Sequence, residues 1–300
     1  MIMAASVTKR FGEVTAVNDV NVTIKAGEVF GLIGTNGSGK STFLRMACGV
    51  LKPDSGTVLV DEKPVYGNPA VKADIFYISD DQYFLPNATP ENMADFYADY
   101  YGAFDRARFE DLLGSFQLKP HRKINTFSKG MKKQLSILLG ICANTKYLFC
   151  DETFDGLDPV MRQAVKSIFA GELAERDFTP VIASHNLREL EDICEYVGLL
   201  HKGGILFEKD IDEMKLNIHN IQCVFQNTED EKAAFGLLNI VKAEKRGTLN
   251  IITARGLERE IMDKINSFSP VFAEILPLTL EEIFISETEV VGYDIKKLIF

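Results

Sequence analysis

The sequence lacks several features that would assign the protein to common classes. No apolar run approaches the ~20 residues that a membrane-spanning helix needs. Basic charge is not in excess, since 33 Lys plus Arg stand against 43 Asp plus Glu and give a formal net charge of −10. Binding to nucleic acid through phosphate neutralisation requires clustered basic residues, so no nucleic-acid partner is expected.

Cysteines are few and show no pairing motif. Five are present, an odd number, and no two of them form a C-x-x-C pair. The opening seven residues are too short for the apolar part of a signal peptide, and Lys9 and Arg10 follow this stretch instead of preceding it. We therefore expect reduced thiols, mostly in the core, and a cytoplasmic location.

The composition that is present is that of a globular protein, with 46% hydrophobic and 25% charged residues. Val14–Glu28 alternates loosely between apolar and polar residues, which predicts antiparallel strands. Four short apolar runs predict strands buried on both faces: Val29–Ile33, Lys146–Cys150, Thr179–Ala183 and Tyr196–Leu200. Helical patterns separate these runs, so the predicted fold is α/β with a parallel sheet.

Residues 86–145 carry only helical patterns and predict a helical subdomain. Thr89 offers a capping hydroxyl, Pro90 suits the first helical position, and Glu91 adds an acid in the first turn. Five aromatic residues follow at helical spacing: Phe96, Tyr97, Tyr100, Tyr101 and Phe104. We expect most of them in the core of the subdomain and one or two beside a groove.

The pattern changes again after residue 212. Strands and helices are predicted there in the order βαββαβ, which is the order of ferredoxin-like modules. The stretch Thr279-Leu280-Glu281-Glu282 matches a capping box and predicts a final helix. We therefore expect two domains, residues 1–212 and residues 213–300, and the second is an α+β accessory module.

The stretch from Gly34 to Ser41 matches the phosphate-binding pattern G-x-x-x-x-G-K-S, between a predicted strand and a predicted helix. Glycines let backbone N–H groups curl around phosphate oxygens, and the N-terminal end of the helix adds positive charge. Lys40 is expected to reach the β- and γ-phosphates, and the Ser41 hydroxyl to ligate Mg²⁺. The residues expected to bind the nucleotide are Gly34, Thr35, Asn36, Gly37, Ser38, Gly39, Lys40, Ser41 and Thr42.

A second motif, Tyr147–Glu152, consists of four apolar residues followed by two acids. The apolar residues predict a buried strand, and the Asp151 carboxylate at its end is expected to reach the metal ion. Glu152 follows directly and is well placed as the general base or as a water-positioning residue for hydrolysis. Many strands end in acids, so the motif is weak alone but strong together with a phosphate loop.

Over about residues 1–212 the chain resembles the nucleotide-binding subunit of an ABC transporter. Phe127-Ser128-Lys129-Gly130-Met131 resembles the signature motif, in a variant similar to that of small drug, peptide and lipid exporters. The resemblance implies a P-loop NTPase fold with a parallel sheet core, an antiparallel β subdomain and a helical subdomain. It also implies that Ser128 and Gly130 bind the γ-phosphate of ATP held by the other subunit.

Three further positions match the family. Asp158, in Gly156-Leu157-Asp158-Pro159, resembles the D-loop aspartate at the dimer interface. His185 follows a predicted strand and resembles the switch-loop histidine that contacts the γ-phosphate and orients the attacking water. Phe11 occupies the position of the aromatic residue that stacks on adenine, for which a ring suffices.

The signature departs from the family's common form at Lys129 and Met131, and one position near the expected metal site departs as well. The family has Gln after the strand that matches Ile75–Ser79, where the Gln touches Mg²⁺ and links the site to the membrane partner, whereas this chain has Asp80. A carboxylate can serve a hard cation through oxygen, and Gln82 could take the role after a shift of two residues. Asp80 and Gln82 are therefore both metal-site candidates, together with Ser41 and Asp151.

The resemblance implies an ATP-hydrolysing enzyme in which Lys40, Glu152 and His185 are catalytic. Two copies would enclose two ATP molecules with Mg²⁺ and power the export of a peptide, drug or lipid. The chain would work through a separate transmembrane permease, as a peripheral protein at the inner face of the cell membrane.

Three other classes use related motifs. A DNA-linked clamp ATPase would need coiled-coil arms, and the short stretch between Lys40 and Phe127 has no heptads. A substrate-phosphorylating P-loop kinase would not need Ser128 or His185. A stand-alone regulatory ATPase without a membrane partner usually has two such cassettes in one chain, whereas this chain has one, and it remains the alternative.

Overall fold

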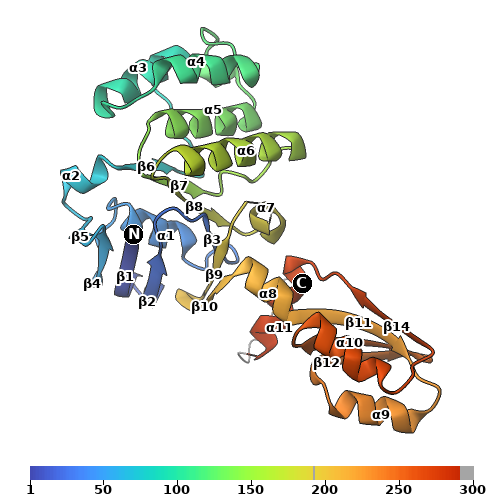
Figure 1. The fold of residues 1–300 in the computed structure, drawn as a ribbon. Helices are drawn as coiled ribbons and strands as arrows, with labels where there is room; N and C mark the ends of the chain where they lie inside the picture. The colour runs from blue at the N-terminus through green and yellow to red at the C-terminus, as the bar shows by residue number, and fades with distance from the viewer. Residues whose placement is uncertain (192, 291–300) are drawn as a thin grey trace. The chain divides into compact units, whose positions relative to one another are not determined.

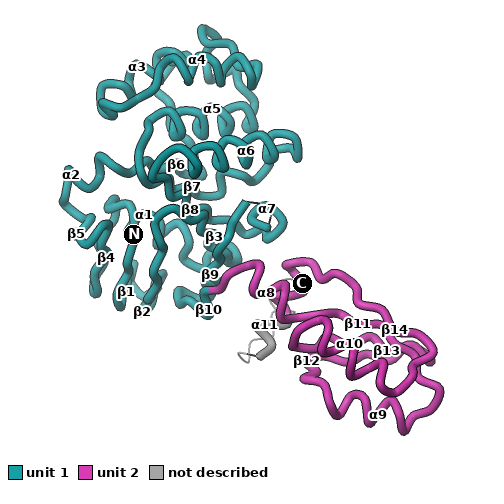
Figure 2. Tube along the Cα trace, in the orientation of Figure 1, with its two compact units in different colours: residues 1–208 teal, residues 209–300 magenta. Residues whose placement is uncertain are grey.

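The computed structural model describes residues 1–191 and 193–290. The chain divides into two compact units, of which the first is Met1–Glu208 and the second begins at Lys209 (Figure 2). Each unit has a hydrophobic core of its own, which is the physical mark of a domain.

Six strands form the central sheet of the first unit in the order β10-β9-β3-β8-β7-β6 (Figure 1). They are β3 (Phe30–Ile33), β6 (Ile75–Ile78), β7 (Tyr147–Asp151), β8 (Thr179–Ser184), β9 (Tyr196–His201) and β10 (Gly204–Asp210). All residues of β3, β7 and β8 are buried, and β3 and β6 to β9 run parallel. Continuous apolar runs are typical of strands covered on both faces, and the predicted parallel core is confirmed.

A second, antiparallel sheet has the order β2-β1-β4-β5. Its strands are β1 (Ile2–Phe11), β2 (Val14–Ile24), β4 (Ser55–Val60) and β5 (Lys63–Pro64). Helix α1 (Lys40–Ala47) contributes Phe43 and Leu44 to a cluster that also contains Val20 of the antiparallel sheet and Phe149 of the parallel sheet. This shared core fixes the N-terminus of α1 directly after β3.

The regular elements between residues 86 and 145 are all helices, as predicted (Figure 1). They are α3 (Pro90–Tyr100), α4 (Arg106–Ser115), a 3-10 turn (Ile124–Thr126) and α5 (Lys129–Cys142). Thr89 caps α3, because its Oγ1 accepts a hydrogen bond from the Asn92 N–H at 3.3 Å. Asn92 completes the box by accepting from the Thr89 N–H at 3.2 Å.

The expectation that most of the five aromatic residues form the core of this subdomain is wrong. None of the five is fully buried, and Tyr100 is 70% exposed. Met93 and Ala94 take the buried positions of α3 instead. Four of the rings contact one another or Phe76 of β6 at tilted or edge-on angles, with 5.0 Å between the centroids of Phe76 and Tyr97. The fifth, Phe104, contacts Phe109 of α4.

The remaining helices of the first unit are α2 (Pro69–Lys72), α6 (Pro159–Glu175) and α7 (Leu187–Glu191). Glu172 of α6 is 1% exposed, and its carboxylate is paired with two arginines. One is Arg176, one turn further along the helix, and the other is Arg108 of α4. This buried ion cluster joins the helical subdomain to a helix of the parallel-sheet core.

The second unit has the predicted α+β order. Its elements are α8 (Ile211–Asn217), β11 (Ile218–Val224), α9 (Thr228–Gly236), β12 (Asn239–Arg246), β13 (Leu249–Arg255), α10 (Glu258–Asn266), β14 (Phe272–Leu276) and α11 (Leu280–Val290). The sheet order β12-β13-β11-β14 is antiparallel throughout, which is the ferredoxin-like arrangement. Thr279 and Glu282 form the predicted capping box before α11.

No helix in the described part of the chain combines the length and the apolar character that crossing a membrane requires.

Glu172→Gln is expected to destabilise the first unit by about 3 kcal/mol, because the buried position of Glu172 loses the negative charge that pairs with Arg108 and Arg176. Unfolding in urea, followed by circular dichroism, measures the change. Glu175→Gln, an exposed neighbour on the same helix, is the matched control and is expected to change stability by less than about 0.5 kcal/mol. Equal effects of the two substitutions would contradict a structural role for the ion cluster.

Candidate ATP site

The segments expected to carry the chemistry meet at one edge of the parallel sheet. In its register Ile33 pairs with Ser184, and Asp151 pairs with Ala183. Parallel strands end at the same edge, and ligands of such sheets bind outside the carboxyl ends of the strands. The phosphate loop after β3, the acids at the end of β7 and the switch loop after β8 are therefore brought together.

The phosphate loop depends on its glycines. Gly37 and Gly39 have φ of 79° and 108°, which side chains rarely allow. A Cβ on Gly39 would lie 2.2 Å from the carbonyl oxygen of Ala16, and a Cβ on Gly34 would lie 2.4 Å from the Ser38 Oγ. Gly39 is also the N-cap of α1 and has no side chain to cap the helix, so the first turn presents N–H groups to an anion.

Lys40 joins the phosphate loop to the acid after β7. Its side chain is 5% exposed, and the ammonium donates to the carbonyl oxygen of Gly34 at 2.6 Å and to that of Thr35 at 3.3 Å. The same Nζ lies 3.1 Å from Oε1 of Glu152. A buried ammonium needs such oxygen partners, so a bound phosphate would compete with Glu152 for Lys40.

Ser41 and Asp151 are in contact, as a shared metal site requires. The Ser41 Oγ donates to Asp151 Oδ1 at 2.9 Å, and the Tyr77 hydroxyl donates to Oδ2 at 3.0 Å. Burial raises the pKa of the Asp151 carboxyl, although both hydroxyl contacts oppose this shift. Sequence reasoning missed Tyr77, which reaches Asp151 from the neighbouring strand β6 and has no local motif around it.

The donor set at Ser41 and Asp151 fits Mg²⁺, a hard cation that prefers oxygen. No three His, Cys, Asp or Glu side chains gather into a metal site in residues 1–191 and 193–290. Magnesium usually keeps several waters and binds through one or two protein groups plus substrate phosphates, so a sparse protein set is the expected form.

Glu152 is the most constrained residue of the site. Its φ of 48° lies in the left-handed region, and its N–H donates to the carbonyl oxygen of Ala183 at 2.9 Å. Oε1 faces Lys40, whereas Oε2 lies 2.8 Å from Nδ1 of His185 and accepts from the His185 N–H at 3.3 Å. The structure therefore brings together the three residues predicted to be catalytic.

The switch loop around His185 is held by Glu189 of α7. The Ser184 Oγ donates to Glu189 Oε2 at 2.8 Å, and Asn186 Nδ2 donates to Oε1 at 3.3 Å. These are the residues on either side of His185. Burial raises the pKa of the Glu189 carboxyl, whose residue is 4% exposed. Sequence reasoning missed this residue, although an acid four positions after a loop histidine could have prompted it.

Asp80 and Gln82, the two candidates for the position where the family has Gln, make different contacts. Gln82 is tied to its own loop, because Nε2 donates to the carbonyl oxygens of Ser79 at 3.2 Å and Asp80 at 2.8 Å. The Asp80 carboxylate lies 3.8 Å from Nζ of Lys133 on α5. Which of Asp80 and Gln82 takes part in metal binding stays a prediction.

The residues expected to act on the other subunit's ATP lie on exposed helix ends. Ser128 and Asp158 are exposed and cap α5 and α6, where they accept hydrogen bonds from backbone N–H groups of their own helices. Gly130 lies in the first turn of α5. Phe11, at the end of β1, is 52% exposed, so its ring offers a face for stacking. The roles of these four residues stay predictions.

A small cavity of about 180 Å³ lies beside Gln82. Its lining includes Phe76 of β6, Tyr97 of α3 and Tyr83, which is 74% exposed. Exposed aromatic residues beside a hollow are typical of protein contact sites.

The fold and the site define a nucleotide-binding protein of the P-loop type, and the comparisons identify its family. The model of the family described as ABC transporter matches residues 17–155. The ABC transporter ATP-binding protein YtrB of Bacillus subtilis is 32% identical, over 96% of this chain and 98% of that one. The chain therefore belongs to the ATP-binding proteins of ABC transporters and is an ATPase.

Two further relatives extend the comparison. The bacitracin transport ATP-binding protein BcrA of Bacillus licheniformis is 29% identical, over 72% of this chain and 71% of that one. The post-hydrolysis dimeric structure of the ATP-binding cassette MJ0796 bound to ADP and Pi superimposes with a TM-score of 0.62 and 24% identity, covering 70% of this chain and 98% of that one. The structural likeness supports the predicted ABC ATPase fold.

Lys40→Ala is expected to weaken ATP binding by roughly 30- to 150-fold, because a charge-assisted contact to phosphate contributes about 2–3 kcal/mol. Isothermal titration calorimetry with ATP measures the change. Lys63→Ala removes an exposed lysine of β5 and is the control. Unchanged affinity in the Lys40 variant would contradict the assignment of the phosphate loop.

Proposed function

We propose that the chain hydrolyses ATP with Glu152 as general base. In this proposal His185 orients the Glu152 carboxylate. The observation that carries this proposal is the position of the Glu152 carboxylate, 3.1 Å from Lys40 Nζ and 2.8 Å from His185 Nδ1. A base must lie within reach of the proton that it accepts, and an oriented carboxylate beside the phosphate loop meets this condition.

In this proposal Lys40, the loop N–H groups and the start of α1 hold the phosphates. Lys40 leaves Glu152 when it pairs with phosphate, and the freed Oε1 accepts the proton of the attacking water. His185 keeps Oε2 in place through its Nδ1 and its N–H. Ser41 and Asp151 would hold Mg²⁺, which would supply neutralisation of the phosphate charge. Phe11 stacks on the adenine.

The active form is proposed to be a homodimer that encloses two ATP molecules. Ser128 and Gly130 at the exposed start of α5, and Asp158 at the start of α6, would complete the site of the second copy. A helix N-terminus with a capping hydroxyl suits a terminal phosphate. The dimeric cassette MJ0796, which shares the fold, gives a precedent for the arrangement.

The transport role is proposed to be export through a separate transmembrane permease, with the chain at the inner face of the membrane. Support comes from BcrA, whose name describes bacitracin transport, and from the probable multidrug protein YbhF of Escherichia coli, 30% identical over 73% of this chain and 39% of that one. The cavity beside Gln82 with exposed Tyr83 is the proposed permease contact. A peptide is the favoured substrate class, while a drug or a lipid is the other option.

The alternative function, a stand-alone regulatory ATPase, differs in one testable respect. It requires no membrane partner, whereas the export proposal requires a stable complex with one.

Glu152→Gln is expected to lower kcat by 10²- to 10⁴-fold, the range for loss of a general base. ATP binding stays intact, because the neutral amide no longer competes with phosphate for Lys40. The variant is expected to form a stable dimer with ATP and Mg²⁺, measured by light scattering coupled to size-exclusion chromatography. A monomer under these conditions would contradict the enclosed-dimer proposal.

The permease proposal is tested by affinity purification of the tagged chain from detergent-solubilised membranes of the host cell, followed by mass spectrometry. A multispanning membrane protein is expected in stoichiometric amount. Replacing Tyr83 with Glu is expected to reduce its recovery at least tenfold while ATPase activity of the isolated chain persists. Recovery of the chain alone would favour the stand-alone ATPase.

A further inference from the structure

A buried lysine outside the motifs described above contacts the backbone of the catalytic segment. Lys133 lies on α5, one turn after Ser128, and is 1% exposed. Burying an ammonium is costly unless oxygen atoms surround it. The oxygen atoms that surround the Lys133 ammonium therefore show which groups its charge holds in place.

The Lys133 ammonium holds the ends of the turn that follows β7. Nζ donates to the carbonyl oxygen of Glu152 at 2.6 Å and to that of Asp155 at 2.8 Å. Glu152 is the residue with the left-handed backbone, φ 48°, and such a conformation persists only where its surroundings fix it. The Ala183 carbonyl oxygen accepts from the N–H of Glu152, so the peptide groups on both sides of the residue are bound.

Two carboxylates balance the charge of Lys133. Asp155 Oδ2 lies 3.9 Å from Nζ, in the same turn, and Asp80 Oδ1 lies 3.8 Å away, in the loop after β6. The Lys133 ammonium thus links α5, which belongs to the helical subdomain, to two loops at the edge of the parallel sheet. Its two short contacts go to backbone oxygens, which side-chain substitution within the turn cannot remove.

We propose that Lys133 is a positioning residue for ATP hydrolysis. It fixes the left-handed backbone of Glu152 and thereby aims the Glu152 carboxylate. This inference rests on the proposed role of Glu152 as general base. Without the ammonium, the turn relaxes toward an ordinary backbone conformation, and the carboxylate moves away from the place where a water can be activated. Misplacement by about 1 Å costs on the order of 100-fold in rate.

A purely structural role makes different predictions. A lysine that only supports the fold would, when lost, lower thermal stability and nucleotide affinity together with rate. A positioning residue acts through Glu152, so its loss lowers kcat while Kd for ATP stays constant. Its effect also vanishes once Glu152 has been replaced, because residues that act as one unit are not additive.

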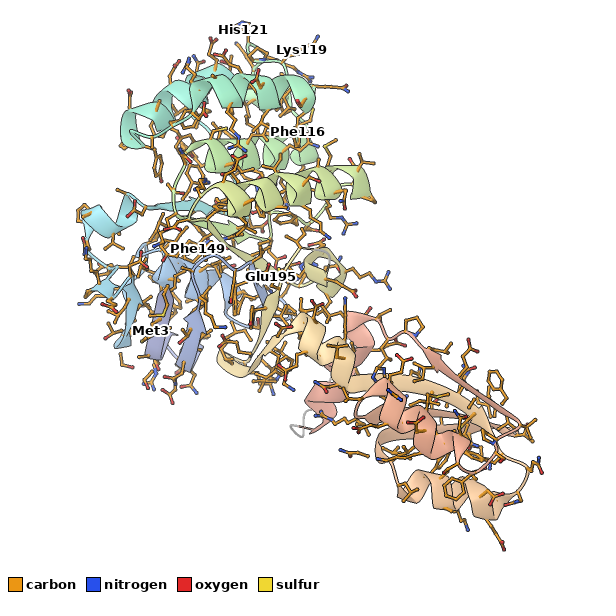
Figure 3. All side chains as sticks on the ribbon, viewed as in Figure 1. Met3, Phe116, Lys119, His121, Phe149 and Glu195 are labelled. Carbon is orange, nitrogen blue, oxygen red and sulfur yellow. The ribbon has the colours of Figure 1, made fainter. Side chains whose placement is uncertain are left out.

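The test uses the full-length chain and four variants. They are Lys133→Met, Lys133→Gln, Glu152→Gln and the double variant Lys133→Met with Glu152→Gln. Lys133→Gln keeps a neutral hydrogen-bond donor, and it provides a second measurement should Lys133→Met fold poorly. Lys119→Met, an exposed lysine in the connection after α4 (Figure 3), is the matched control. ATPase kinetics, ATP titration calorimetry and thermal melts are recorded for each.

Lys133→Met is expected to lower kcat by 10- to 100-fold, with Kd for ATP within twofold of the parent. The kcat of Lys133→Gln is expected to lie between that of Lys133→Met and that of the parent. The double variant is expected to match Glu152→Gln within twofold. Multiplying effects in the double variant, unchanged kcat in both Lys133 variants, or joint loss of affinity and stability would overturn the inference. Parent-like activity of Glu152→Gln would instead overturn the proposed general base.

Discussion

The site depends on how the chain turns at the end of β7. Glu152 has a left-handed backbone there, and this conformation separates it from Asp151, which stays buried against Ser41 and Tyr77. Two adjacent acids thereby have different surroundings and can have different tasks. Burial raises the pKa of the Asp151 carboxyl, which contacts two hydroxyl groups, whereas the Glu152 carboxylate is shared by Lys40 and His185. The proposed division between metal binding at Asp151 and base catalysis at Glu152 would thus rest on environment and not on residue type.

The parallel sheet makes this division possible. Its strands end at one edge, so residues far apart in sequence meet without long loops. The same edge receives contacts from the helical subdomain, because Lys133 of α5 reaches both Asp80 in the loop after β6 and the turn after β7. The buried cluster around Glu172 attaches that subdomain to α6. A movement of the helical subdomain would therefore act on the turn that carries Glu152.

The parts of the site that follow from local pattern could be predicted from the sequence. The phosphate loop needs glycine for backbone reasons, and a buried strand ending in two acids has a clear apolar pattern. Contacts between distant elements could not be predicted in this way. Tyr77 and Lys133 look like ordinary strand and helix residues. The sheet register brings Tyr77 beside Asp151, and the packing of α5 brings Lys133 to the turn after β7. The aromatic residues of α3 were misplaced because helical spacing identifies a face but not how much of it is covered.

The central claim is that ATP binding draws Lys40 from the Glu152 carboxylate to the phosphates, and that a water then takes the place of Lys40 beside Glu152. A crystal structure of the chain with Mg²⁺ and a non-hydrolysable ATP analogue measures this directly. The expected result places Lys40 Nζ within about 3 Å of the β- and γ-phosphates, with Glu152 Oε1 hydrogen-bonded to a water in line with the γ-phosphate. A Lys40–Glu152 pair that persists beside the bound nucleotide, with no water on Glu152, would contradict the account.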